Sequence, residues 1–310
     1  MKACRAHYFG PPNVIIFEDV SRPVPGRGEV LVRVKAAGVG PWDAWVRAGK
    51  SALPQPLPLT PGADLSGVVE AAGPGAAAWP PGTAVFGVTN PRFTGAYAEY
   101  ALAAVGMLAT KPSRLSDVEA ASVPVVAVTA HQALFEQAGL TAGQSVLVHG
   151  ANGNVGNYVV QMARLAGLRV AATVGRRDVE VVRRLGAQEI IDDSTRRFED
   201  VSRGVDAVID LVGGEMQARS FAVLKTGGVL VSTVSQPDQE AAARHGVRAW
   251  FFLVNVTTAH LTRIAGMIDA GELTPRVGAV LALADARIAH EMLEGARPRP
   301  GGKIVLRVGE

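Results

Sequence analysis

The sequence predicts an α/β protein of two domains, a β-barrel-like domain and a doubly wound parallel sheet. In the first hundred residues, short strand-like runs are separated by Pro-Gly and Gly-Pro pairs. From about Leu115 onward, strand-like and helical segments alternate, which is typical of a parallel sheet covered on both faces. A glycine-rich turn joins one of these strands to its helix. With 310 residues, the chain is long for one domain and comfortable for two.

The composition argues against several classes of function. Hydrophobic residues make up 48% of the chain and charged residues 19%, an ordinary profile for a folded soluble protein. No apolar run approaches the ~20 residues of a membrane span, and the N-terminal residues lack the pattern of a signal peptide. Cys4 is the only cysteine, which rules out an internal disulfide and predicts a cytoplasmic location. A net charge of +3 is too small to predict a nucleic-acid partner.

The first domain is predicted from strand-like runs at residues 14–18, 29–36, 66–71 and 84–88. Between them, Trp42, Trp45 and Val46 have helical spacing. On that helix Asp43 and Arg47 are four residues apart, which favours a structural ion pair over direct catalysis. The last apolar run, within residues 301–308, is expected to return to this domain.

The second domain begins with a helical segment whose N-cap and capping-box positions are Ser116 and Glu119. After the first strand of its sheet, further strands are predicted at 169–174, 188–191, 205–212, 228–234 and 249–253, and a helix at 179–185 is closed by Gly186. In such a sheet, ligands bind at the carboxyl ends of the strands.

The glycine turn follows the apolar run at 146–148 and has glycines at Gly150, Gly153 and Gly156. A helical pattern begins directly after it. Glycines allow positive φ and a close approach of phosphates, and the unpaired N–H groups of a helix N-terminus attract a pyrophosphate. The turn departs from the usual G-x-G-x-x-G because Ala151 replaces the first glycine, so a turn without a ligand remains an alternative.

Six segments together carry a resemblance to a known family: GVGPWDAWVRAG, PGADLSGVVEAAG, GAYAEY, VLVHGANGNVG, DLVGG and GGKIVL. In this order, they resemble the medium-chain dehydrogenase/reductase superfamily, and within it the zinc-independent, zeta-crystallin-like quinone oxidoreductases. The resemblance implies a GroES-like β-barrel domain at residues 1–115 and 274–310 and a Rossmann NADPH-binding domain at 116–273. It also implies a homodimer formed through the edge of the Rossmann sheet.

A catalytic zinc needs three side chains from Cys, His and Asp/Glu. Zinc-dependent relatives place a cysteine in the segment that corresponds to residues 38–43 and a His-Glu pair near residues 62–64. Here the first segment has no cysteine and the second offers only Asp64. With Cys4 alone, a structural zinc site is also excluded, so the sequence predicts a metal-free enzyme.

The choice of cofactor depends on the end of the second strand, where NAD-binding proteins place an acid for the ribose 2′-OH. This chain has Gly175 there, followed by Arg176 and Arg177, and its nearest acid, Asp178, comes too late. Two guanidinium groups match a 2′-phosphate in charge and geometry. The pattern therefore predicts NADPH, bound at least about ten-fold tighter than NADH. A pair of solvated surface arginines is the alternative.

By resemblance, the candidate cofactor-binding residues are Thr129, Gly150, Asn152, Gly153, Asn154, Val155, Gly156, Gly175, Arg176, Arg177, Val212, Gly213, Ser232, Phe251, Phe252 and Val254. For the last three, core packing is an equal alternative. The candidate catalytic residues are Asp43, Trp45, Arg47, Asp64 and Thr129. His149 is expected to be structural, and Lys303 is expected to be solvated. Gly40 and Trp45 depart from the asparagine and tyrosine that are common in the family.

These expectations together predict an NADPH-dependent, zinc-independent reductase that transfers hydride to a quinone or an α,β-unsaturated carbonyl compound. A small molecule is the expected partner, with neither nucleic acid nor membrane. Two alternatives remain, a biosynthetic enoyl or ketone reductase and a catalytically idle NADPH-binding protein. No proton relay is identifiable, and hydride chemistry tolerates this because the cofactor carries the reaction and solvent can supply protons.

Overall fold

The computed structural model describes residues 1–309, which form two compact units. Unit 1 comprises Met1–Val125 and the segment from Val256 onward, and unit 2 comprises Val126–Asn255. Residues 116–125 and 256–273, expected in the nucleotide-binding domain, group with unit 1. Helix α2 (Asp117–Ala121) packs there on the central strands β3 and β4, and α8 (Thr258–Asp269) packs on β7.

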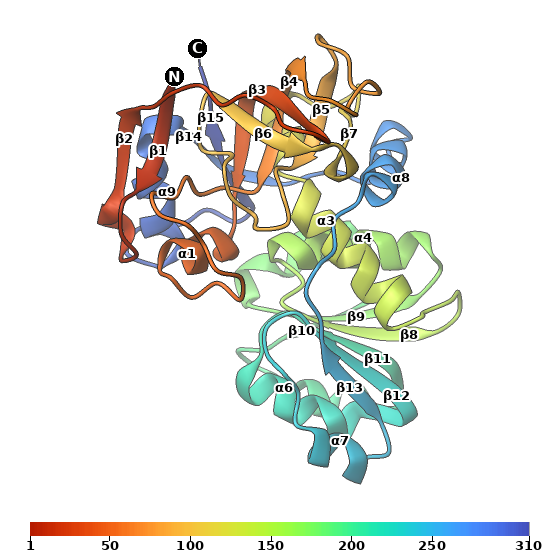
Figure 1. The fold of residues 1–310 in the computed structure, drawn as a ribbon. Coiled ribbons are helices and arrows are strands. Elements are labelled where there is room, and N and C mark those ends of the chain that lie inside the picture. The colour runs from red at the N-terminus through yellow and green to blue at the C-terminus, as the bar shows by residue number, and fades with distance from the viewer. Residues whose placement is uncertain (310) are drawn as a thin grey trace. The chain divides into compact units, whose positions relative to one another are not determined.

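Unit 1 is built on a seven-stranded sheet in the order β14-β15-β3-β4-β5-β7, with β6 paired to β3 (Figure 1). All pairs are antiparallel except β14 with β15, and β15 pairs with β3, which confirms the predicted return of the last run. A separate antiparallel ribbon is formed by β1 and β2. The strands are β1 (Lys2–Ala6), β2 (Ile15–Asp19), β3 (Glu29–Val39), β4 (Asp64–Ala72), β5 (Ala84–Val88), β6 (Tyr100–Ala104), β7 (Leu108–Thr110), β14 (Val277–Ala282) and β15 (Lys303–Arg307).

The main core of unit 1 lies against this sheet and contains buried residues of β3, β4 and β15, such as Val32, Leu65 and Leu306. Two further helices belong to the unit, α1 (Pro41–Arg47) and α9 (Ala286–Leu293). The predicted capping box of α2 is confirmed, because Ser116 and Glu119 accept reciprocal hydrogen bonds. None of the helices within residues 1–309 combines the length and apolarity that a membrane span requires.

Unit 2 is a six-stranded, fully parallel sheet in the order β10-β9-β8-β11-β12-β13. The first strand in sequence lies at the centre and the chain winds outward in both directions, the arrangement of dinucleotide-binding sheets. Figure 1 shows α4 on one face and α6 and α7 on the other. The elements are α3 (Pro124–His131), β8 (Ser145–His149), α4 (Asn154–Leu165), β9 (Arg169–Val174), α5 (Val179–Leu185), β10 (Glu189–Asp192), β11 (Val205–Asp210), α6 (Gly214–Ser220), β12 (Leu224–Ser232), α7 (Gln239–Arg244) and β13 (Arg248–Phe251).

The six predicted strands of unit 2 are all present, but some of their ends differ. β11 ends at Asp210, two residues earlier than expected, because the Asp210 carboxylate accepts the N–H groups of Val212 and Gly213 and turns the chain there. β12 begins at Leu224 rather than at residue 228, and its pairing with β11 contains a register shift.

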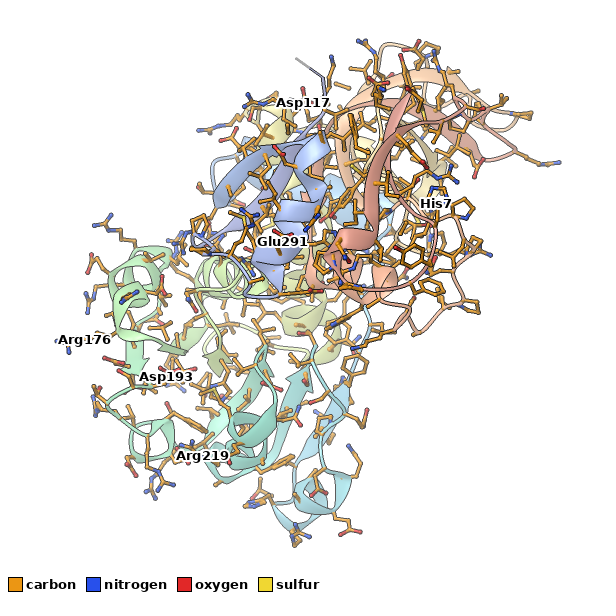
Figure 2. The ribbon with its side chains drawn as sticks, turned by 90° about the vertical axis from the view of Figure 1, so that its left-hand side faces the viewer. His7, Asp117, Arg176, Asp193, Arg219 and Glu291 are labelled. Carbon is orange, nitrogen blue, oxygen red and sulfur yellow. The ribbon has the colours of Figure 1, made fainter. Side chains whose placement is uncertain are left out.

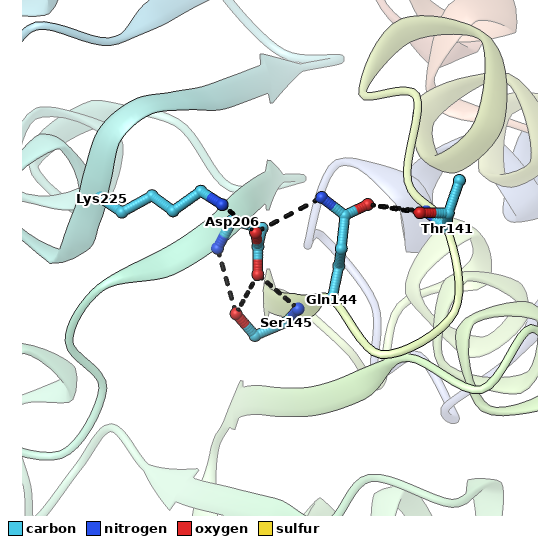
Figure 3. Close-up of polar contacts among 5 residues, drawn as sticks. All are labelled: Thr141, Gln144, Ser145, Asp206 and Lys225. Atoms are coloured by element: carbon cyan, nitrogen blue, oxygen red, sulfur yellow. Dashed lines mark hydrogen bonds and ion pairs between the residues drawn. The ribbon is translucent and has the colours of Figure 1, made fainter.

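At the amino ends of β8 and β11, one carboxylate joins the two strands. Asp206 accepts hydrogen bonds from the Ser145 backbone N–H (2.8 Å) and hydroxyl (2.7 Å), and it is ion-paired with Lys225. Figure 3 shows this cluster together with Gln144, whose amide nitrogen lies 3.4 Å from Asp206 Oδ1. The carboxyl ends of the strands, where ligands bind in sheets of this kind, lie at the opposite end of the sheet.

Candidate functional site

The carboxyl ends of the parallel strands all lie at the same end of the unit 2 sheet, its carboxyl edge. The register aligns Asp210 with both His149 and Ser232, and Ser232 with Phe251. The predicted cofactor-binding residues follow these ends: Gly150, Asn152, Gly153, Asn154, Val155 and Gly156 after β8; Gly175, Arg176 and Arg177 after β9; Val212 and Gly213 after β11; Ser232 and Phe251 at the ends of β12 and β13; and Phe252 and Val254 beyond β13. Thr129 follows none of these strands and is buried on α3.

The glycine turn has a geometry that only glycine permits. Gly150 has a φ of +73°, and its carbonyl accepts the N–H of Gly153 at 3.0 Å. A Cβ atom on Gly156 would lie less than 3.0 Å from the Gly150 carbonyl oxygen and from the backbone of Ala151. Because the N-cap of α4 is Gly153, no side chain caps the first N–H groups of this helix. The turn therefore fits a pyrophosphate held at a helix N-terminus.

The tips of β8, β11 and β12 touch one another along the same edge. A Cβ on Gly150 would lie 3.1 Å from Val212 Cγ2, and one on Gly213 would lie 3.1 Å from Val234 Cγ1. Val212 and Val234 are themselves 48% and 40% exposed. The edge therefore combines open backbone at the glycine turn with an exposed apolar surface, as a nucleotide site requires.

Beyond β9, the chain turns through Arg176 and Arg177, and both side chains are exposed. Figure 2 shows Arg176 projecting outward from unit 2, on the same side as Asp193. The nearest acid, Asp178, accepts a 2.8 Å hydrogen bond from Asn152 Nδ2 of the glycine turn. Hydrogen bonds from Ser194, with a smaller effect of the Arg176 charge, lower the pKa of Asp192. These two acids therefore already accept hydrogen bonds from the protein, Asp178 from Asn152 and Asp192 from Ser194.

His149 is structural, as the sequence predicts. It is fully buried and its two ring nitrogens lie 3.0 Å from Thr173 Oγ1 and 2.9 Å from Ser220 Oγ. Burial lowers the pKa of His149 to about 4, so the ring is neutral at pH 7. It is no general base for a ligand.

The predicted ion pair between Asp43 and Arg47 is wrong. Both residues lie on α1 and are buried, but each bonds to residues distant in sequence. Arg47 donates to the Gly10 carbonyl (2.9 Å), contacts His290 Nδ1 (2.9 Å) and is ion-paired with Glu294. Since Arg47 is only 1% exposed, it holds α1 against α9 rather than facing a substrate.

Asp64 forms a buried ion pair that the sequence did not reveal. Lys303 Nζ on β15 lies 2.8 Å from Asp64 Oδ2, and the two side chains are 2% and 0% exposed. Asp64 Oδ1 accepts the Val125 N–H at 2.9 Å. The expectation of a solvated Lys303 is therefore wrong, because a carboxylate far away in sequence neutralises it inside unit 1.

Trp42, a residue without a predicted role, shapes the same region. Its ring lies 4.3 Å from Lys303 Nζ, and a Cβ on Gly40 would lie less than 3.0 Å from three carbons of the ring. Position 40 therefore carries glycine because Trp42 fills the space of a larger side chain. Trp45 is 52% exposed, whereas the other catalytic candidates of unit 1, Asp43, Arg47 and Asp64, are buried.

Asp43 carries a perturbed carboxyl group. Burial raises its pKa to about 7, although Oδ2 accepts the Gly40 N–H (2.8 Å) and the Tyr97 hydroxyl (3.0 Å) and the Lys303 charge lies nearby. Oδ1 is buried and has no hydrogen-bond partner among the described residues. A folded chain therefore retains a proton on Asp43 that an unfolded chain releases above the ordinary carboxyl pKa.

This shift predicts a pH-dependent effect of Asp43→Asn. Between about pH 4 and pH 7 the wild type loses stability as pH rises, because only its folded state holds the proton. The asparagine variant has no proton to release at this position, so it does not lose stability in this way. The unfolding free energy of the variant relative to the wild type should thus rise by on the order of 1 kcal/mol per pH unit and level off above pH 7. Urea unfolding from pH 4.5 to 8.5 measures the difference, in which the common contributions of His149 and His290 cancel. A pH-independent difference would contradict the raised pKa.

Two families match this chain. Residues 26–113 match the alcohol dehydrogenase GroES-like domain, and residues 185–306 match a family described as zinc-binding dehydrogenase. The human quinone oxidoreductase is 32% identical over 324 residues, covering 99% of this chain and 98% of the relative.

Solved structures agree with this match. A quinone oxidoreductase from Coxiella burnetii superimposes with a TM-score of 0.92 at 32% identity, covering 100% of this chain and 99% of the other. A mycobacterial protein in complex with NADPH gives a TM-score of 0.86 at 30% identity, covering 99% and 100%.

The fold of the two units and these matches define an oxidoreductase with a GroES-like domain and a Rossmann domain that uses a nicotinamide cofactor on a small-molecule substrate. The chain belongs to the medium-chain dehydrogenase/reductase superfamily, in which it groups with the quinone oxidoreductases of the zeta-crystallin-like branch. The predicted fold class and family are thus confirmed.

Proposed function

We propose that this enzyme is an NADPH-dependent, zinc-independent reductase that transfers hydride to a quinone or an α,β-unsaturated carbonyl compound. The observation that carries the cofactor preference is the pair of exposed arginines, Arg176 and Arg177, directly beyond Gly175 on the carboxyl edge of the sheet. Their charge and forked geometry suit a 2′-phosphate. The quinone oxidoreductase relatives support the acceptor class.

The residues of unit 2 fit such a cofactor. The open N-terminus of α4 is suited to the pyrophosphate, and exposed Val212 presents an apolar surface beside the glycine turn. When bound, reduced nicotinamide supplies the hydride. Of the candidate acids, Asp43 and Asp64 are fully buried in unit 1 and hydrogen-bonded within it. The protein's contribution is then orientation and exclusion of water, with protons taken from solvent.

Zinc independence is supported by the surroundings of Asp64. At the position corresponding to the His-Glu pair of zinc-dependent relatives, this chain has only the Asp64 carboxylate, and Lys303 Nζ already lies 2.8 Å from it. A buried ammonium group at that distance opposes a divalent cation. The single cysteine, Cys4, is buried, and burial raises the pKa of its thiol to about 12, so it offers no thiolate at neutral pH. The residues around Asp64 therefore do not fit a catalytic zinc.

A panel of electron acceptors tests the proposed reaction. NADPH oxidation is followed with a naphthoquinone, an enone and an enoyl thioester, using enzyme freed of metal by a chelator. Turnover of the quinone or the enone supports the proposal. Turnover of the thioester alone would identify a biosynthetic reductase, and tight NADPH binding without any turnover would identify an idle binding protein.

The cofactor preference is tested by replacing both Arg176 and Arg177 with alanine. The wild type should bind NADPH at least ten-fold tighter than NADH, a difference of about 1.4 kcal/mol. The double variant should lose this advantage while its dissociation constant for NADH changes less than two-fold, because only the phosphate contacts are removed. Equal dissociation constants for the two cofactors in the wild type would overturn the assignment.

We also propose a homodimer formed through β13, the edge strand of the unit 2 sheet. Beside this strand lies a hollow of about 430 Å³ lined by Ala242, Arg248 and Trp250 among others. An unpaired edge strand invites pairing with a second chain. Light scattering should give twice the mass of the 32.3 kDa chain, and a monomer mass would refute the dimer.

A further inference from the structure

A single buried carboxylate connects the strand tips of the proposed cofactor site. Asp210 is the last residue of β11 and is 0% exposed. Its Oδ1 accepts the backbone N–H groups of Val212 (3.1 Å) and Gly213 (2.8 Å). Its Oδ2 accepts Gln217 Nε2 and Ser232 Oγ, both at 2.8 Å. Protein donors therefore use both oxygens, which leaves Asp210 itself unsuited to bind a ribose.

The contacts extend from β11 to the loop that follows β12. Ser232 Oγ accepts the N–H groups of Val234 (3.1 Å) and Ser235 (3.3 Å), and Gln217 Nε2 donates to the Ser235 carbonyl at 3.1 Å. Asp210 thus fixes its own loop directly and the neighbouring loop through Ser232. The two loops carry the exposed side chains of Val212 and Val234. The loop after β11 touches the glycine turn at Gly150, and the loop after β12 touches Gly213.

We infer that Asp210 is a positioning residue of the cofactor site, which holds the loops after β11 and β12 in the conformation that receives the nicotinamide dinucleotide. The inference rests on the proposed function for the identity of the ligand. Its physical basis is preorganisation: loops already fixed by buried hydrogen bonds do not have to be ordered when the ligand binds.

The substitution Asp210→Asn should disrupt the hydrogen bonds that hold the two loops. All four groups around the carboxylate act as donors toward it. An asparagine must point its NH₂ group either at the two backbone N–H groups or at Gln217 and Ser232. In either orientation a buried donor faces donors, so one of the loops must be released.

Asp206→Asn is the matched control, because Asp206 joins the same strand, β11, to its neighbour at the opposite edge of the sheet. Each purified protein is assayed for its NADPH dissociation constant, its melting temperature, and hydrogen exchange of the Val212, Gly213 and Val234 amides without ligand. Asp210→Asn should raise the NADPH dissociation constant at least ten-fold and speed exchange on the released loop, either at the Val212 and Gly213 amides or at the Val234 amide. Asp206→Asn should lower the melting temperature but leave NADPH affinity within two-fold.

A folded Asp210→Asn protein with unchanged NADPH affinity or unchanged exchange would overturn the inference, as would an equal loss of affinity in Asp206→Asn. If Asp210→Asn does not fold, Gln217→Ala tests the inference in its place, because it removes the donor to the Ser235 carbonyl and keeps the Asp210 carboxylate. It should weaken NADPH binding several-fold, and unchanged affinity counts against the inference. A wild type that binds neither NADPH nor NADH refutes the proposed function, while the exchange data still test the positioning role.

Discussion

Replacing Lys303 by methionine is expected to lower the free energy of unfolding by about 3–5 kcal/mol. The variant leaves Asp64 as a buried carboxylate whose Oδ2 has lost the ammonium group 2.8 Å away, while Oδ1 keeps only the Val125 N–H. Methionine is unbranched like lysine and only one atom shorter, so it still fills most of the space beside the Trp42 ring and packing accounts for little of the loss. Urea unfolding at pH 7, followed by tryptophan fluorescence, measures the change.

Two comparison proteins separate the buried pair from a general effect of losing a lysine. Lys303→Met combined with Asp64→Asn removes both charges and keeps an acceptor for Val125, and should recover most of the lost stability. Lys2→Met removes a lysine whose pair with Asp19 is exposed on both sides (46% and 74%), and should cost less than about 1 kcal/mol. If Lys303→Met proved as mild as Lys2→Met, the buried pair would contribute nothing.

Sequence signals of short range predicted the parallel sheet of unit 2 correctly. The apolar runs of β8 and β9, the three glycines from Gly150 to Gly156 and the closing Gly186 act within a few residues of one another. Because all parallel strands end on the same side, the order of strands and turns alone brings the predicted residues to one edge.

The wrong predictions concern contacts between distant parts of the chain. Lys303 and Asp64 are 239 residues apart, and nothing near either residue indicates that one would bury the other. The spacing of Asp43 and Arg47 suited a pair on a helix surface, but α1 is buried on the sides that carry both, so Tyr97 and Glu294 became their partners. The early end of β11 has a local cause instead, because the Asp210 carboxylate accepts the N–H groups of Val212 and Gly213, and the apolar pattern of the strand does not indicate this turn.

Gly156→Ala is expected to weaken binding of the nicotinamide cofactor at least about 100-fold, or about 2.7 kcal/mol. The added Cβ would lie less than 3.0 Å from the Gly150 carbonyl and from two backbone atoms of Ala151, and none of these can rotate away. Helix α4 must then move off the end of β8, which takes the N–H groups at its N-terminus away from the pyrophosphate. Titration with NADPH, together with the melting temperature, measures both effects.

Gly266→Ala on α8 is the matched control for Gly156→Ala. A Cβ at position 266 would meet no atom within 4 Å, and glycine destabilises the interior of a helix. This substitution should raise stability by about 0.5–1 kcal/mol and leave cofactor affinity unchanged. The contrast isolates the close approach between strand and helix as the reason why position 156 needs glycine. Wild-type NADPH affinity in Gly156→Ala would show that the pyrophosphate does not depend on this turn, and the cofactor site would have to be sought at another part of the sheet edge.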